Sequence, residues 1–378
     1  MNQISRRDFL QQFGTATAGL TLGRSAWARV IMPPAGRSGA FEMLVVGDSH
    51  ISGQGLVKEH KTYYLVKDWL EREYLRNSRP VNLLVKAHSG SRIDLHPDEL
   101  EKMSALGDDI NKFHHPEANI SQPSIRRQIE VARTEYDDPG EVDLVMLSGG
   151  ITDVLVANTV NPFVKENVLR ERIDKYCGKS MYSLLEQATD SFPNATFVVV
   201  GYFPVISTKS DISKIARYLF KAVRFPHPLQ FTLTNPASRQ LLKVLRKKMA
   251  LRSRIWLEES NRAIGGAVER INARFEKPRV IYVHSPITEE TCFGTKNSML
   301  WATDGDNFPA DERYAERREI CREVFTELKH DHYGKLAVRM CELAAIGHPN
   351  IEGARAFAEA VKEQLGPALE SRRLAANL

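Results

Sequence analysis

Residues 43–55 read Met-Leu-Val-Val-Gly-Asp-Ser-His-Ile-Ser-Gly-Gln-Gly, an apolar run that ends in a polar turn containing glycine. Four further apolar runs occur at residues 81–85, 142–147, 196–200 and 280–283. Runs of this length without strict alternation are typical of strands that are buried on both faces. Because helical stretches separate the runs, the sequence predicts a three-layer α/β/α domain built on about five parallel strands.

Polar residues that follow these runs mark the expected site, because ligands bind at the carboxyl ends of the strands in parallel sheets. Ser49 comes directly after the first run, in a turn whose backbone N–H groups can face a developing negative charge. Gly90 follows the second run, and Gly-Gly-Ile-Thr-Asp at residues 149–153 follows the third. His348 stands just before the last helical stretch, at residues 352–365.

In order and spacing, these blocks resemble the SGNH (GDSL-like) hydrolase family over about residues 41–204 and 256–366. The resemblance implies a flavodoxin-like fold and hydrolysis of a carboxylic ester, of a lipid or of an acetyl or acyl group, without a metal or an organic cofactor. It implies that Ser49 is the nucleophile and His348 the base. The N–H groups of Ser49 and Gly90, with Thr152, are expected to form the oxyanion hole.

Three residues next to these blocks are expected to shape turns. Asp48, Gly150 and Asp153 flank the predicted catalytic residues, and the side chains of the two aspartates are expected to bond to nearby backbone.

The chain departs from the family pattern at two positions. Thr152 stands where the family has asparagine, and Ala345 stands where it usually has the aspartate that orients the histidine. A backbone carbonyl can orient His348 instead, or a displaced acid can; the candidate acids are Asp304, Asp306, Asp331 and Glu342. The departures also suggest an alternative function, a catalytically weakened member of the fold that binds an envelope lipid or glycan.

The first 28 residues resemble a twin-arginine export signal, with Arg6-Arg7, a mild apolar run and the small-x-small sequence Ala26-Trp-Ala28. Cleavage after Ala28 predicts a periplasmic or secreted protein. We expect a linker at residues 29–40, the hydrolase domain at residues 41–370 and a C-terminal tail at residues 371–378.

A basic segment interrupts the alternation of strands and helices at about residues 205–255. Residues 209–254 contain 12 Lys or Arg and one acid, Asp211, with Phe and Leu among them. Prolines divide the segment, so we expect an inserted helical hairpin or lid. Such a segment is either a solvated helical face or an element that meets an anionic membrane surface or an acidic substrate.

Other features narrow the expected partners. The net charge of +5 is small for 378 residues and, with the export signal, argues against nucleic acid. The spacing of His50, His88, His114, His115 and His284 is not that of a metal site. The four cysteines permit disulfides, but we expect most of them to be reduced core residues. The partner expected is an ester substrate, and the sequence does not specify an oligomeric state.

Overall fold

The apolar run at residues 43–46 forms the middle of strand β1 (Phe41–Gly47), whose central side chains are fully buried. A computed structural model describes residues 39–211, 236–303, 309–328 and 334–376. All of these residues lie in one compact unit, Ser38–Leu378. The predicted signal peptide at residues 1–28 lies outside the described residues, as does most of the predicted linker.

Five parallel strands form the sheet, in the order β2-β1-β3-β4-β5. The other four strands are β2 (Val81–Val85), β3 (Val142–Ser148), β4 (Thr196–Val200) and β5 (Val280–Val283). Strand β2 lies next to one edge of β1, and the chain then returns to place β3 next to the other edge of β1. The carboxyl ends of β1 and β3 therefore lie side by side, with Gly47 paired with Ser148. This reversal of strand order is where open α/β sheets bind their ligands.

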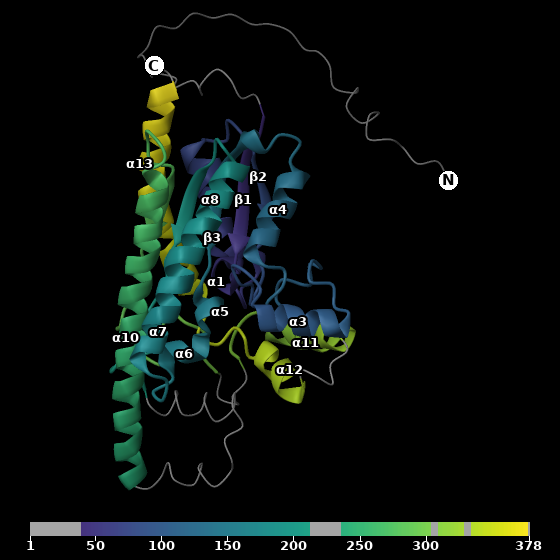
Figure 1. Cartoon of the computed structure of the whole chain (residues 1–378). Coiled ribbons are helices and arrows are strands. Elements are labelled where there is room, and N and C mark those ends of the chain that lie inside the picture. Colours follow the sequence, from purple (N-terminus) through teal and green to yellow (C-terminus); the bar gives the residue numbers. More distant parts are fainter. Residues whose placement is uncertain (1–38, 212–235, 304–308, 329–333, 377–378) are drawn as a thin grey trace, which may run out of the picture. The chain divides into compact units, whose positions relative to one another are not determined.

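Helices cover both faces of the sheet (Figure 1). Leu44 and Val46 of β1 pack with α4 (Ile125–Glu135), α7 (Glu166–Ile173), α8 (Met181–Ser191) and α10 (Pro236–Asn272). Met43 and Val45, which point the other way, pack with α2 (Thr62–Trp69) and α13 (Ile351–Ala376). The predicted three-layer α/β/α fold is confirmed.

Shorter elements complete the described chain. Four lie near the carboxyl edge of the sheet or follow it: α1 (Ser49–Ser52), α3 (Pro97–Leu106), α5 (Ile151–Val154) and α6 (Val156–Val160). Two more precede the last helix: α11 (Tyr314–Glu327) and α12 (Gly334–Glu342). The rest are single turns and π-helical segments: η2 (Lys58–His60), η3 (Leu70–Tyr74), η4 (Pro139–Glu141) and η5 (Asp174–Ser180).

Two predicted boundaries do not coincide with the ends of helices. The basic segment was expected to end near residue 255, but α10 runs unbroken from Pro236 to Asn272. Residues 212–235, the first part of the predicted hairpin, lie outside the described residues. The predicted tail at residues 371–378 begins inside α13, where Arg372 donates to Thr196 Oγ1 at 2.6 Å. Relative to the prediction, α10 thus begins earlier and α13 ends later.

The expectation that most of the four cysteines are reduced is wrong, because two of them form a disulfide. Cys321 in α11 and Cys341 in α12 form a disulfide, whereas Cys177 and Cys292 are buried thiols. Adjacent packing of α11 and α12 brings the paired residues together.

Within the described ranges, the helices are too short or too polar to cross a membrane.

Candidate active site

Ser49 is the first residue of α1, immediately after β1. Asp48 caps this short helix and accepts a hydrogen bond from the His50 N–H at 3.0 Å. Gly47 has a φ of +140°, and a Cβ there would lie 2.5 Å from the Ser148 carbonyl oxygen. Only glycine fits this tight exit from the strand, which turns Ser49 over the carboxyl edge of the sheet.

The structure brings Ser49 and His348 together. The Ser49 Oγ atom lies 2.7 Å from His348 Nε2, although the two residues are 299 positions apart in the chain. The His348 backbone is held by the 299–301 segment, since its carbonyl accepts the Trp301 N–H at 2.8 Å. A hydroxyl within hydrogen-bond reach of an imidazole is the geometry of a nucleophile and its base.

No carboxylate among the described residues bonds to the second ring nitrogen of His348. His348 Nδ1 is buried and faces the backbone carbonyls of Ala344 and Ala345, without a hydrogen bond of good geometry. The carboxylate of Glu342, one of the predicted alternative acids, instead pairs with Arg339 at 2.8 Å. The other three candidate acids lie outside the described residues.

Burial sets the charge of the histidine. Desolvation lowers the pKa of His348 to about 4, while the nearby carbonyls oppose this shift. The imidazole is therefore neutral at pH 7, the form in which it can accept a proton from Ser49.

A buried hydrogen-bond network supports the nucleophile turn. Ser148 donates to Asp48 Oδ1 at 2.6 Å, and the Tyr202 hydroxyl donates to Asp48 Oδ2. The Tyr202 oxygen also accepts the Ile151 N–H at 3.3 Å, so it links the turns after β1 and β3. Burial raises the pKa of Asp48, while the donors from Ser148 and Tyr202 favour its ionised form. The predicted turn-shaping role of Asp48 thus extends beyond its own backbone.

Sequence reasoning did not single out Ser148, Tyr202 or Gln128. Gln128 accepts the Gly47 N–H at 2.7 Å and donates to the Gly47 carbonyl at 3.1 Å, which fixes the end of β1. Tyr202 lies two residues after β4, so the same strand-end rule that marked Ser49 also marks Tyr202.

Two backbone N–H groups, in the turns after β1 and β2, lack a hydrogen-bond acceptor among the described residues. The N–H groups of Ser49 and Gly90 take no part in the hydrogen bonds among the described residues. Gly90 has a φ of +82°, and a Cβ there would lie 2.5 Å from the Ile120 carbonyl oxygen. The loop after β2 therefore requires glycine at this position, and its N–H is free to bind an anion.

The Thr152 hydroxyl is engaged elsewhere. Thr152 Oγ1 donates to the Ser91 carbonyl oxygen at 2.5 Å, and this bond uses its single proton. In this arrangement Thr152 braces the loop that carries Gly90, which differs from the oxyanion role predicted for it. Ser91 is held in turn by Gln128, whose Nε2 donates to Ser91 Oγ at 2.9 Å.

Asp153 and Gly150 both lie in the turn after β3. Asp153 Oδ2 accepts the Ile93 N–H at 3.1 Å, and burial raises the pKa of Asp153 to about 7. Gly150 has a φ of +117° at the start of α5. Both positions are consistent with a role in shaping the turn.

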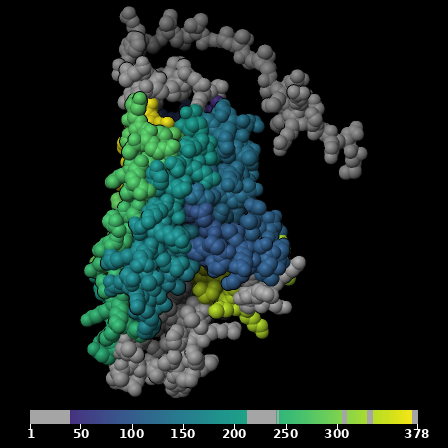
Figure 2. Space-filling view, viewed as in Figure 1, coloured from purple at the N-terminus to yellow at the C-terminus, as the bar shows by residue number. Residues whose placement is uncertain are grey.

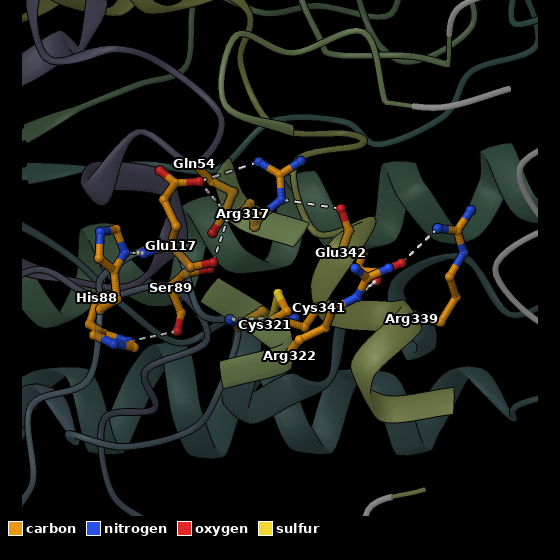
Figure 3. The surroundings of a disulfide bond; sticks show 12 residues. Gln54, His88, Ser89, Glu117, Arg317, Cys321, Arg322, Arg339, Cys341 and Glu342 are labelled. Carbon is orange, nitrogen blue, oxygen red and sulfur yellow. Dashed lines mark hydrogen bonds and ion pairs between the residues drawn. A yellow bond between two sulfur atoms is a disulfide. The ribbon is translucent and has the colours of Figure 1, made fainter. Parts of the chain in front are cut away.

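A buried ionic cluster joins the nucleophile turn to the segment that leads to His348 (Figure 3). Glu117 accepts hydrogen bonds from Gln54 Nε2 at 3.0 Å and from the Gly55 N–H at 3.2 Å. Arg317 contacts Glu117 at 3.3 Å and Asp311 at 2.6 Å, and its Nε donates to the Glu342 carbonyl at 3.2 Å.

The disulfide adds a covalent link beside this cluster. Cys341, paired with Cys321, accepts the Asn119 N–H at 3.4 Å, next to the loop of Gly90. The cluster and the disulfide therefore connect the nucleophile turn, the loop that carries Gly90 and the segment that leads to His348.

The histidines considered as metal ligands have other surroundings. His50 packs against Phe357 with 4.6 Å between ring centres, and burial lowers its pKa to about 3. His88 Nδ1 lies 2.9 Å from the Ser89 carbonyl oxygen. Across the described part of the chain, His, Cys, Asp and Glu side chains form no group of three suited to a metal ion.

Comparison with known proteins finds similarity only at the level of structure. No protein-family model and no curated protein matches the sequence. Phospholipase A1 from Streptomyces albidoflavus NA297 is 10% identical, with a TM-score of 0.41, and the match covers 86% of this chain and 100% of that one. An extracellular lipase from Streptomyces rimosus is 12% identical, with a TM-score of 0.40 and coverage of 86% and 100%. A family 3 carbohydrate esterase from Clostridium thermocellum is 14% identical, with a TM-score of 0.37 and coverage of 88% and 99%. Because these likenesses are weak, the function is inferred from the geometry of the site.

Proposed function

We propose that this protein is a serine ester hydrolase of the SGNH type. The observation that carries the proposal is the 2.7 Å contact between Ser49 Oγ and a neutral His348 Nε2. The contact lies at the carboxyl edge of the sheet, where the N–H groups of Ser49 and Gly90, in the turns after β1 and β2, are free to bind an oxyanion.

The reaction has two stages. Ser49 Oγ attacks the ester carbonyl while His348 takes the hydroxyl proton, and the N–H groups of Ser49 and Gly90 stabilise the negative oxygen. His348 then gives the proton to the leaving alcohol, which leaves an acyl group on Ser49. A water molecule, deprotonated by His348, attacks this acyl group and releases the acid, and the proton returns to Ser49.

The proposed substrate is a carboxylic ester, of a lipid or of an acetyl or acyl group. We propose that the protein acts in the periplasm or outside the cell, after export directed by residues 1–28. The Cys321–Cys341 disulfide favours this location, because disulfides persist in oxidising compartments.

A second candidate is a weakened member of the fold that binds an envelope lipid or glycan. Two observations favour it: His348 Nδ1 bonds to no described carboxylate, and the Thr152 hydroxyl is engaged by Ser91. Both reduce the stabilisation that a typical triad and oxyanion hole provide.

Turnover of short nitrophenyl esters separates the two candidates. The hydrolase predicts that purified protein turns over nitrophenyl butyrate and that Ser49→Ala and His348→Ala each abolish this activity. Ser78→Ala and His284→Ala are matched controls at exposed positions and should keep it. A folded wild-type protein without turnover would favour the binding protein.

A further inference from the structure

Apolar side chains are exposed where the chain leaves the turn after β3. Val156 in α6 is 49% exposed and Phe163, in the loop that follows, is 83% exposed. Single exposed apolar residues are ordinary on protein surfaces, whereas neighbouring ones that form a patch mark interaction sites.

The first half of α10 presents a second set of exposed residues. Val244 is 43% exposed and Leu251 is 49% exposed, and they lie two helical turns apart on one face. Lys243, Lys247 and Lys248 are exposed around them, and none takes part in the ion pairs among the described residues. Residues 236–255 hold seven Lys or Arg and no Asp or Glu.

Arg252 fixes these two elements to each other. Its side chain is buried, and its guanidinium donates to the Asn158 carbonyl at 2.8 Å and to the Val164 carbonyl at 2.7 Å. These contacts hold the loop of Phe163 against α10, and Figure 1 shows α6 beside this half of the helix. In Figure 2 the two segments form neighbouring parts of the surface on the face that is shown. Together they form what we call the apolar-basic face, which comprises Val156, Phe163, Val244, Leu251, Lys243, Lys247 and Lys248.

The apolar-basic face is connected to the candidate active site. Helix α5, which contains Thr152, leads directly into α6. The Ile151 N–H at the start of α5 bonds to Tyr202, which bonds to Asp48 beside the nucleophile. One part of this face is therefore continuous in the chain with the segment that is bonded, through Tyr202, to the nucleophile turn.

We infer that the apolar-basic face docks the protein on an anionic lipid surface and that the substrate is a lipid ester presented there. This inference rests on the proposed hydrolase function. The lysines attract anionic headgroups, and the apolar side chains between them enter the boundary with the acyl chains. Polyanions such as nucleic acid would use the lysines but would leave Phe163 and Leu251 exposed.

Vesicle binding tests the inference without requiring turnover. The mature protein is sedimented with vesicles of phosphatidylcholine, with and without phosphatidylglycerol. We expect binding only to the anionic vesicles, and binding that weakens as salt is added. Because each basic residue near such a surface contributes about fivefold in affinity, Lys243→Gln/Lys247→Gln/Lys248→Gln should lose on the order of 100-fold. Phe163→Ser should also weaken binding, with less dependence on salt.

Matched variants locate the surface. Lys102→Gln/Lys277→Gln/Lys296→Gln removes three exposed lysines elsewhere, and Leu336→Ser removes an exposed leucine of α12 that is 53% exposed. Both should bind as the wild type does. Equal losses in the control and test variants, or a wild type that binds neither kind of vesicle, would overturn the inference.

Hydrolysis of a soluble nitrophenyl ester, measured on the same proteins, keeps the two proposals separate. The variants of the apolar-basic face should retain that activity. A wild-type protein that hydrolyses the soluble ester but does not bind vesicles would overturn the docking inference alone. A wild-type protein that does not hydrolyse the soluble ester would overturn the proposed hydrolase function.

Discussion

His348 Nε2 lies 2.7 Å from Ser49 Oγ, although the two residues are 299 positions apart in the chain. Ser49 is carried by the tight turn after β1, whereas His348 is held by backbone bonds to the 299–301 segment. The second ring nitrogen of His348 faces backbone carbonyls in place of a described carboxylate. The pair therefore has the geometry of a nucleophile and its base, and no carboxylate among the described residues orients the base.

The pH dependence of activity reports on the buried histidine. Burial lowers the pKa of His348 to about 4, so the imidazole is already neutral and able to accept a proton above that pH. We expect kcat/KM to rise as the pH increases through about 4 and then to stay level to neutral pH. A profile measured with a soluble nitrophenyl ester checks this. An acid limb near 6.5, the ordinary value for histidine, would show that the ring is solvated or paired with an acid.

Tyr202→Phe should loosen the nucleophile turn. The hydroxyl donates to the buried Asp48 carboxylate and accepts the Ile151 N–H, so its removal leaves both groups with one partner fewer. We expect the free energy of unfolding to fall by about 1–3 kcal/mol and kcat to fall with little change in KM. Tyr282→Phe is the matched control, because that hydroxyl donates to Asn261 and does not bond to Asp48 or to Ile151. An unchanged kcat for Tyr202→Phe would remove Tyr202 from the support of Ser49.

Substitution of Thr152 distinguishes a brace from an oxyanion donor. Its hydroxyl donates to the Ser91 carbonyl at 2.5 Å, so we expect Thr152→Val to lower kcat by less than about tenfold and Thr152→Ser to restore it. Loss of a true oxyanion donor costs on the order of 10²–10³ in kcat. A loss of that size for Thr152→Val would return Thr152 to the oxyanion hole.

The disulfide should contribute measurably to stability. Cys321 and Cys341 are 20 positions apart, and closing a loop of that length is worth about 3 kcal/mol. Denaturant unfolding with and without a reducing agent measures the effect, and activity should fall in parallel because Cys341 lies in the segment that leads to His348. Cys321→Ser/Cys341→Ser serves as the control, because reductant should no longer change its unfolding. Equal stability of the oxidised and reduced wild type would contradict this contribution.

The fold could be predicted from the sequence because each buried strand is a short run of apolar residues that can be recognised locally. The apolar runs at residues 81–85, 196–200 and 280–283 match β2, β4 and β5 at both ends. The long helix α10 was not predicted whole, because the basic composition of its first half resembles a solvated insertion. Buried contacts such as those of Arg252 anchor that half to the body, and these depend on distant residues.

The sequence predicted which residues at the ends of strands form the site, but not the hydrogen bonds that connect the loops around them. Ser49 and Gly90 follow strands, so their position at the carboxyl edge could be inferred. The Thr152 hydroxyl bonds to Ser91 because two loops meet, which no local pattern encodes. The count of cysteines permits a disulfide but does not choose the pair, since pairing depends on how α11 and α12 pack.

Covalent labelling tests the central claim most directly. The purified mature protein is treated with a fluorophosphonate, and the modified residue is identified by mass spectrometry of its peptides. We predict a single adduct on Ser49 that is lost in Ser49→Ala and forms much more slowly in His348→Ala. A folded wild-type protein that gains no adduct, or gains one on another residue, would contradict the assignment of Ser49 as the nucleophile.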